Sequence, residues 1–293
     1  MKSKRRLGDR YDGRKLRSLD PFSRLIPYIM KKRSESQNLF DETIPIAETE
    51  KYLHQMRRGE LKKIGYLHVI LAAIVRTLAL KPGLNRFIAG GKIYARNEIL
   101  ISLVIKKQLT EESPETSVKI KFDPTDTIFD VVRRINAVIE ENKKEETNNS
   151  ADKAVDIFNL CPGFLLKFVV WFLRKLDSIG CLPKAIADLS PFHSSVFVTD
   201  LGSLGVKPVY HHLFEFGTNS IFIAFGIKQR ENARHKDASG NISVGKTMNI
   251  KIVTDDRITD GYYFAQAFKL FRSLLQNPQQ LELPPEKVVE DIV

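Results

Sequence analysis

The residues best suited to chemistry lie in the stretch TDDRITDGYYFAQAFKLF, residues 254–271. Its centre places two carboxylates, Asp256 and Asp260, four residues apart in a polar turn that follows a strand-like run and precedes an amphipathic helix. A histidine pair, His211 and His212, lies in a loop earlier in the chain. Aspartate and histidine are residue types that general acid–base catalysis uses, so these positions are the first candidates for a site.

Three stretches, in chain order, resemble the catalytic domain of the acyltransferase components of 2-oxo acid dehydrogenase complexes. DPFSRLIPYIMKKR (20–33) is similar to the opening helix of that domain, and FVTDLGSLGV (197–206) to its central strand and glycine turn. DDRITDGYYFAQAFKLFRSLLQNPQQL (255–281) resembles its H-R-x-x-D-G signature with the helix behind it. The resemblance covers residues 20–283 and implies the fold that the chloramphenicol acetyltransferases share.

The resemblance also implies a mechanism. In the family a histidine takes the proton from a thiol of coenzyme A or dihydrolipoamide, and the thiolate attacks a thioester. A hydroxyl on the central strand donates to the tetrahedral oxyanion, and the site lies between subunits of a trimer. Carried over to this chain, Thr199 stands at the hydroxyl, Asp260 and Gly261 at the aspartate and glycine of the signature, and Asp256 at the histidine.

The aspartate at position 256 is a weaker base than the histidine it replaces. A free aspartate has a pKa of about 3.9, against about 6.5 for histidine and about 8.5 for a thiol. Proton transfer to aspartate is therefore less favourable by roughly 3.5 kcal/mol. The neighbouring carboxylates of Asp255 and Asp260 would recover part of this deficit through like-charge repulsion. The replacement thus predicts an impaired base, with a retired active site as the alternative.

Other residues could serve as the base. His211 and His212 are the leading candidates, because the corresponding loop of the family lines the substrate channel. His193 precedes the central strand and is a weaker candidate, while His68 lies in an apolar helix and is expected to be a hydrogen-bonded core residue. Cys161 or Cys181 as an acyl carrier is disfavoured, since neither has a basic neighbour in the sequence that would lower its pKa.

Hydrophobic periodicity supplies the elements that must position these residues. Residues 65–81 predict a buried helix, and residues 86–105 a hairpin turning at Gly90-Gly91. A further helix should begin at a cap formed by Thr125 or Asp126. The last helix carries an apolar face made of Phe264, Phe268, Phe271 and Leu275. Further strands are expected at 42–49, 195–200, 220–229 and 247–255. Interleaved helices and strands predict one α/β domain with a mixed sheet.

An apolar helix over residues 157–176 departs from what the family requires. It carries aromatic side chains next to basic ones, Trp171 and Phe172 beside Arg174 and Lys175 among them. One interpretation is packing in the core or at a trimer interface. The other is a helix that lies on an anionic membrane surface. The run is too short, and too interrupted by charge, to span a bilayer.

Charge and cysteine content bound the function classes. The formal net charge is +11, and residues 1–33 hold twelve basic against three acidic residues. We expect this basic arm to be a solvated extension, with contact to an anionic membrane or to nucleic acid as the alternative. The rest of the chain is close to neutral, which argues against a dedicated nucleic-acid binder. Two cysteines in apolar surroundings fit buried thiols in a reducing, cytoplasmic compartment, with a disulfide between them as the alternative, and no spacing fits a metal site.

Together these observations predict a chloramphenicol-acetyltransferase-like α/β domain at residues 20–283, preceded by a basic arm at 1–19 and followed by a tail at 284–293. The expected function is acyl transfer from a coenzyme A thioester to an acceptor, in a homotrimer with an altered base. No lipoyl domain is expected in this chain, and the residues that would hold coenzyme A are not identified. The alternative is a catalytically inactive trimeric scaffold, peripheral to the membrane.

Overall fold

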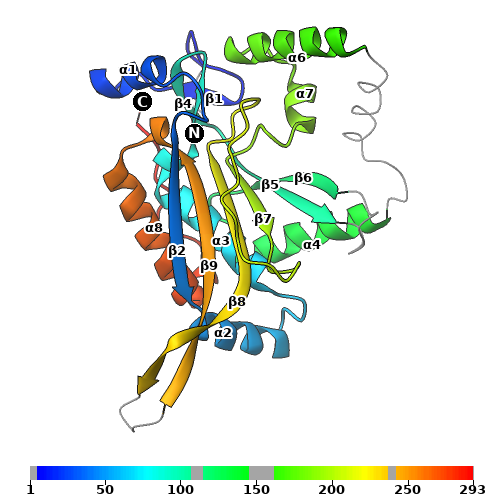
Figure 1. The fold of residues 1–293 in the computed structure, drawn as a ribbon, viewed down its shortest axis with the longest axis vertical. Coiled ribbons are helices and arrows are strands. Elements are labelled where there is room, and N and C mark those ends of the chain that lie inside the picture. Colours follow the sequence, from blue (N-terminus) through cyan, green and yellow to red (C-terminus); the bar gives the residue numbers. More distant parts are fainter. Residues whose placement is uncertain (1–4, 107–114, 145–161, 237–241, 293) are drawn as a thin grey trace.

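The computed structural model describes residues 5–106, 115–144, 162–236 and 242–292. A six-stranded mixed sheet in the order β2-β9-β8-β7-β5-β6 forms its centre (Figure 1). Only the β5–β7 and β7–β8 pairs of this sheet are parallel. The strands are β2 (Gln37–Pro45), β5 (Ile99–Lys106), β6 (Glu115–Phe122), β7 (Val196–Asp200), β8 (Ile221–Lys236) and β9 (Ile242–Asp255).

Three helices, α3 (Tyr66–Leu80), α4 (Ile128–Lys144) and α8 (Gly261–Gln276), gather behind the sheet in Figure 1 and share the main hydrophobic core with it. The predicted buried helix is confirmed, because α3 is buried along most of its length. The apolar face of α8 is confirmed too, since all four of its predicted core residues are buried. The expected cap of α4 is wrong. Thr127 and Asp130 form the reciprocal capping hydrogen bonds instead.

At the opposite end from the long β8–β9 hairpin lies a three-stranded sheet of β1 (Gly13–Lys15), β4 (Lys92–Arg96) and β3 (Arg86–Ala89) (Figure 1). The predicted hairpin is present, and its turn needs glycine because Gly90 and Gly91 have φ of 55° and 71°. Its second half is split between β4 and β5, which belong to different sheets. The helices at this end are α1 (Pro21–Ile29), α6 (Gly163–Ser178) and α7 (Lys184–Leu189).

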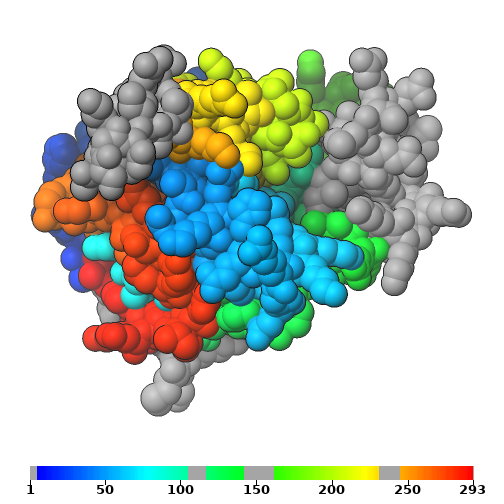
Figure 2. Space-filling model, turned by 90° about the horizontal axis from the view of Figure 1, so that it is seen from below, coloured from blue at the N-terminus to red at the C-terminus, as the bar shows by residue number. Residues whose placement is uncertain are grey.

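The far end is closed by α2 (Ala47–Arg58). Figure 2 views that end and shows α2 bordered by the chain of α8. Short 3-10 turns complete the fold at Pro82–Asn85, Asp256–Ile258 and Pro278–Leu281. Within the described ranges no helix has the length and hydrophobicity needed to cross a bilayer.

The N-terminal arm is not a solvated extension over its described part. Residues 13–15 pair with β4, and Leu16 and Leu19 are buried in the core. Arg10 is 4% exposed and bonded to acidic groups. Basic residues can be buried where carboxylates pair with them. Here Asp12 and Asp177 pair with Arg10, so this part of the arm packs against the protein. The boundaries of arm, domain and tail stay predictions.

Candidate active site

The turn after β9 is fixed by a buried ion pair. Asp255 is fully buried and accepts hydrogen bonds from Arg257 Nε and Nη2, both at 2.7 Å. Its backbone N–H donates to the carbonyl of Ser220 on the neighbouring strand (2.9 Å). A bidentate guanidinium–carboxylate pair is geometrically specific, so the chain leaves β9 in one conformation. Asp255 and Arg257 therefore act as the frame on which the candidate base is held.

Asp256 is half-buried and turns toward the end of β2. Its Oδ1 accepts a hydrogen bond from Asn38 Nδ2 at 2.5 Å, and its backbone N–H donates to the carbonyl of Ser36 (2.8 Å). The charge of Asp255 beside it is matched by Arg257. The like-charge repulsion that the sequence predicted from Asp255 is therefore offset by the guanidinium of Arg257.

Asp260 caps helix α8. Its Oδ1 accepts from the backbone N–H of Tyr263 at 2.9 Å, which satisfies one of the free donors at the helix start. The side chain is exposed, and Gly261 beside it has open space around its Cα. The sequence resemblance gives this position the role of the acidic residue of the signature, and the contact that the structure shows for it is the cap of α8.

Thr199 lies on the central strand β7, half-buried, far from Asp256 along the sheet. It pairs with Ala224 of β8, which in turn pairs with Lys251 of β9. Lys251 and Asp256 are five residue steps apart along the chain, which corresponds to roughly 16 Å at about 3.3 Å per residue. One chain therefore does not bring Thr199 and Asp256 together. That separation is compatible with the expectation that the two groups come from different subunits.

His211 lies on the same face of the sheet as Thr199. Its ring stacks on Phe222 with centroids 4.1 Å apart, and Phe222 stacks on Phe197 at 4.9 Å. Phe197 and Thr199 are two residues apart on β7, so their side chains project from the same face. His211 Nδ1 contacts the carbonyl of His212 at 3.0 Å, and His212 is exposed. Of the predicted residues, the structure places Thr199, His211 and His212 on one face and Asp256 and Asp260 beyond the end of β9.

The turn after Thr199 depends on a close approach of two backbones. A Cβ on Gly202 would meet the carbonyl oxygen of Gly226 at 2.7 Å, so a larger residue would push the turn off β8. Asp200 follows Thr199 and accepts a hydrogen bond from the backbone N–H of Ser203 (3.0 Å), while burial raises its pKa. These contacts fix the end of β7 and with it the position of the Thr199 hydroxyl.

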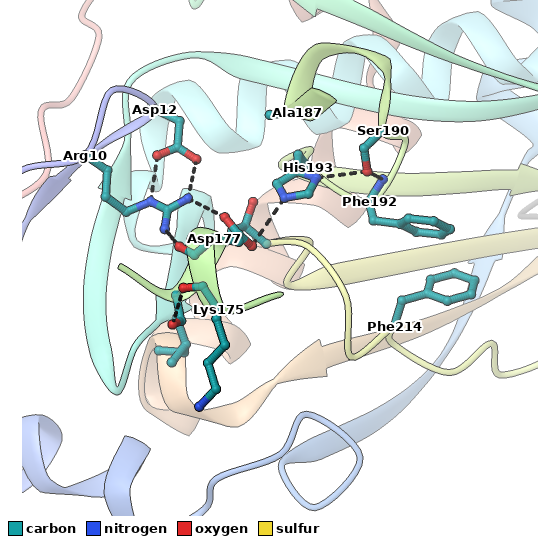
Figure 3. Close-up of polar contacts among 12 residues, drawn as sticks. Arg10, Asp12, Lys175, Asp177, Ala187, Ser190, Phe192, His193 and Phe214 are labelled. Carbon is teal, nitrogen blue, oxygen red and sulfur yellow. Dashed lines mark hydrogen bonds and ion pairs between the residues drawn. The ribbon is translucent and has the colours of Figure 1, made fainter. Parts of the chain in front are cut away.

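His193 belongs to a buried network that the sequence did not predict (Figure 3). Its Nδ1 lies 2.8 Å from Ser190 Oγ and its Nε2 lies 3.3 Å from Asp177 Oδ2. In the neutral ring Nε2–H donates to the carboxylate, which leaves Nδ1 to accept the serine proton. This Asp–His–Ser order is one that activates a nucleophile in hydrolases. Ser190 and His193 are three residues apart and Asp177 lies sixteen residues before His193, and these positions match no motif that would have identified them.

The other side of Asp177 is occupied by Arg10. Arg10 Nη2 donates to Asp177 Oδ1 (2.7 Å), and its Nε donates to Asp12 Oδ1 (2.8 Å). Burial acts to raise the pKa of Asp177, but hydrogen bonds and charge from His193 and Arg10 outweigh it and hold that pKa at about 2. With its charge already matched by Arg10, Asp177 serves chiefly to tie the N-terminal arm, α6 and the segment before β7 together.

Lys119 lies beside the same segment. Its Nζ donates to the backbone carbonyl of Ser190 at 3.0 Å and to that of Ala187, and burial lowers its pKa to about 8. The lysine satisfies carbonyls at the end of α7, a role that a cation near a helix C-terminus commonly fills.

The remaining candidates are placed as follows. His68 is a hydrogen-bonded core residue as expected: its Nδ1 accepts from the backbone N–H of Gly65 (3.0 Å), and burial lowers its pKa. The expectation of buried thiols is wrong for Cys181, which is exposed, and Cys161 lies outside the described residues. Among the side chains that the structure describes, no group of three or more potential metal ligands is assembled.

Comparisons with known proteins confirm the resemblance. Residues 192–283 match the family model of the 2-oxoacid dehydrogenases acyltransferase (catalytic domain). No curated protein sequence matches the chain. The chain has the fold of a probable dihydrolipoamide acetyltransferase from Listeria monocytogenes 4b F2365, with 14% identity and a TM-score of 0.56 over 90% of this chain and 95% of that one.

Two further solved structures have the same fold. Dihydrolipoamide acetyltransferase from Azotobacter vinelandii is 13% identical, with a TM-score of 0.57 over 91% of this chain and 94% of that one. A chloramphenicol acetyltransferase is 10% identical, with a TM-score of 0.50 over 82% and 88%. The predicted mixed α/β fold of the chloramphenicol acetyltransferase type is thereby confirmed, and the predicted trimer stays a prediction.

Proposed function

We propose that this protein, with the fold of the dihydrolipoamide acetyltransferase cores, transfers an acyl group from a coenzyme A thioester to an acceptor. The observation that carries the proposal is the family match over residues 192–283. This range includes Thr199, Asp256 and Asp260, to which the sequence resemblance gives the roles of the catalytic signature. These residues lie on the central strand, on the turn after β9 and at the start of α8, respectively.

Thr199 is the oxyanion donor in this proposal. Thr199 is half-buried near the C-terminal end of β7, and the turn at Gly202 fixes that end. Its hydroxyl is therefore preorganised to donate a hydrogen bond as negative charge develops on the thioester oxygen. Such a donor needs no reorganisation during the reaction, which is why it lowers the barrier.

Asp256 is the general base in this proposal: it takes the proton from the attacking thiol, while Thr199 of a neighbouring copy donates to the oxyanion. The A. vinelandii enzyme was studied for the catalytic roles of a serine, a histidine and an asparagine, the last two separated by four positions. Asp256 and Asp260 have the same spacing. The hydrogen bond from Asn38 orients one oxygen of Asp256 and leaves the second as a proton acceptor.

His211 is the alternative base, because it shares the sheet face of Thr199 within one chain. A neutral imidazole is better matched to a thiol proton than a carboxylate is. Its ring nitrogen Nδ1 already contacts a backbone carbonyl, which leaves Nε2 as the proton acceptor in the neutral form. Substitution of each base in turn distinguishes the two arrangements.

The proposal is tested by following the release of free coenzyme A from acetyl-, butyryl- and octanoyl-coenzyme A, with dihydrolipoamide as acceptor. Thr199→Ala should lower kcat/KM by about 10²–10³ through loss of the oxyanion donor. Thr43→Ala, which changes an exposed strand threonine on β2, is the matched control and should leave kcat/KM unchanged. Equal loss in both variants would reject the role of Thr199. Failure of the wild type to bind or turn over any thioester would favour the inactive scaffold.

A further inference from the structure

Helix α6 carries hydrophobic side chains on two opposite faces. The inner face is half-buried and consists of Leu166, Val169, Leu173 and Leu176. The outer face is exposed and consists of Phe164, Phe168, Trp171 and Phe172. Trp171 is 53% exposed and Phe164 is 77% exposed. Exposed hydrophobic residues on protein surfaces are usually scattered singly. A contiguous apolar face such as this one therefore marks a site that contacts an apolar partner or phase.

Helix α1 presents a second exposed apolar group at the same end of the molecule (Figure 1). Its exposed members are Phe22, Leu25, Tyr28 and Ile29. The turn between β3 and β4 connects the two helices: the backbone of Gly91 lies against the ring of Tyr28, and that of Gly90 against the carbonyl of Ser178 at the end of α6. The two apolar groups are therefore held by one rigid turn and can meet one surface.

A polar cavity of about 200 Å³ lies between these helices. Its charged lining consists of the basic residues Lys31, Arg33, Arg174 and Arg257 and the acidic residues Asp177 and Glu215. Both acidic residues are already engaged, Asp177 by Arg10 and Glu215 by the backbone of Ser34. Within the described ranges, neither Lys31 nor Arg174 is paired with a carboxylate. The cavity therefore has uncompensated positive charge and suits a phosphate-sized anion.

Arg33 supports the assignment of an anion to this cavity. Its side chain is 5% exposed, and its Nε has no hydrogen-bond partner in the structure, with the nearest carboxylate oxygen, on Asp255, 3.7 Å away. An unpaired buried donor is costly, and such donors usually find a ligand, a water or an ion. Burial lowers the pKa of Arg33, as expected for a cation that lacks full compensation.

We propose that α1 and α6 dock the protein on a membrane that contains anionic phospholipid, with the aromatic outer face of α6 in the interface and a lipid phosphate in the cavity. Lys167 and Lys175 border the aromatic face, where long basic side chains can reach head groups while their stems stay apolar. Tryptophan favours this boundary too. The inference goes beyond acyl transfer and does not depend on it.

A second copy of the chain fits this surface less well. In a two-fold contact, both copies would bring the same basic residues to the interface, and like charges placed opposite each other oppose association. Anionic lipid removes that repulsion, because it supplies the opposite charge together with the apolar phase. Charge complementarity therefore selects the membrane over a two-fold contact between copies through this surface.

The test is co-sedimentation of the full chain with vesicles of phosphatidylcholine alone or mixed with phosphatidylglycerol. The wild type should bind the mixed vesicles at least about tenfold more tightly, and raised salt should weaken the binding. Two double variants should each lower binding by about tenfold or more: Phe168→Ser with Trp171→Ser, and Lys31→Glu with Arg174→Glu.

Matched controls change the same side-chain types elsewhere. Leu39→Ser with Tyr262→Ser removes exposed apolar groups on β2 and α8, and Lys51→Glu with Lys63→Glu reverses two exposed charges near α2. Both controls should bind like the wild type. Circular dichroism and urea unfolding establish that every variant is folded.

Four outcomes would overturn the proposal. Equal binding to neutral and anionic vesicles would remove the role of charge, and equal losses in variants and controls would remove the role of this surface. A change of mass in solution on substitution of Phe168 and Trp171, with vesicle binding intact, would make the surface an interface between copies. If inorganic phosphate, at the concentration of the anionic lipid, displaces the protein from the vesicles, the cavity binds a free anion rather than a lipid phosphate.

Discussion

Arg10 and His193 reach Asp177 from opposite sides, and this carboxylate joins the N-terminal arm to α6 and to the segment before β7 (Figure 3). Its pKa of about 2 lies below the ordinary value of 3.8. A carboxylate with a depressed pKa in the folded state stabilises the fold above its unfolded pKa, and that stability is lost as the pH falls through the folded value. The difference corresponds to about 2 kcal/mol, present above about pH 4 and lost as the pH falls toward 2.

We expect Asp177→Asn to lower the free energy of unfolding at pH 7 by about 2 kcal/mol, because Asp12 still faces Arg10 in the variant. The variant should also lose the part of the acid dependence between pH 4 and 2 that Asp177 supplies. Urea unfolding at several pH values measures both effects. Asp188→Asn, at an exposed position on α7, is the control and should behave like the wild type. Unchanged stability in Asp177→Asn would mean that the network contributes nothing to folding.

Among the helices and strands, local periodicity was sufficient to predict some segments from the sequence and insufficient to predict others. The four apolar residues of α8 repeat every three to four positions, and the Gly90-Gly91 turn has its own signature, so both were predicted from the sequence. Strands β1 and β6 were not predicted. β1 is three residues long and exists because it pairs with β4, a contact between residues about eighty positions apart. Pairing of that kind leaves no local pattern.

The residues of the candidate site, too, could be predicted only in part from the sequence. Its motif residues were identified from the sequence because their spacing resembles a known signature. Their neighbours were not, since the partners of Asp256 and His193 come from other parts of the chain: Asn38 lies at the start of β2, and Asp177 in α6. Similarly, the sequence identified the aromatic residues of α6, but only the structure places the basic cavity between α6 and α1.

For the whole molecule, the distance between Thr199 and Asp256 is the decisive feature. About five residue steps along the sheet separate them, which is too far for one substrate atom to contact both within a chain. A complete site of the proposed kind therefore requires a second copy of the chain. An oligomer in which the end of β9 of one copy faces the β7 strand of the next would provide it.

We predict a homotrimer, with a mass in solution three times the chain mass of 33.5 kDa. Sedimentation equilibrium at micromolar concentration measures this mass. Mixed assemblies of Thr199→Ala and Asp256→Ala chains provide a second readout. They should regain part of the activity that each variant lacks, because some interfaces then contain both wild-type residues. A monomer at these concentrations, or mixtures with no regained activity, would contradict a shared site.

The most direct test of acyl transfer at this site is the turnover of acyl-coenzyme A by Asp256→His. Histidine restores the stronger base in the position framed by Asp255 and Arg257, and the full basicity difference of roughly 3.5 kcal/mol would correspond to a few hundredfold in rate. Because rates depend only fractionally on basicity, we expect a gain of about tenfold or more.

The same assay on the double variant Asp256→His/Thr199→Ala should lose most of that gain, through removal of the oxyanion donor. His211→Ala should leave wild-type turnover largely unchanged. An Asp256→His variant with no gain, together with a His211→Ala variant that is inactive, would move the base to His211. Absence of thioester turnover in both the wild type and Asp256→His would contradict the proposal that the protein is an acyltransferase.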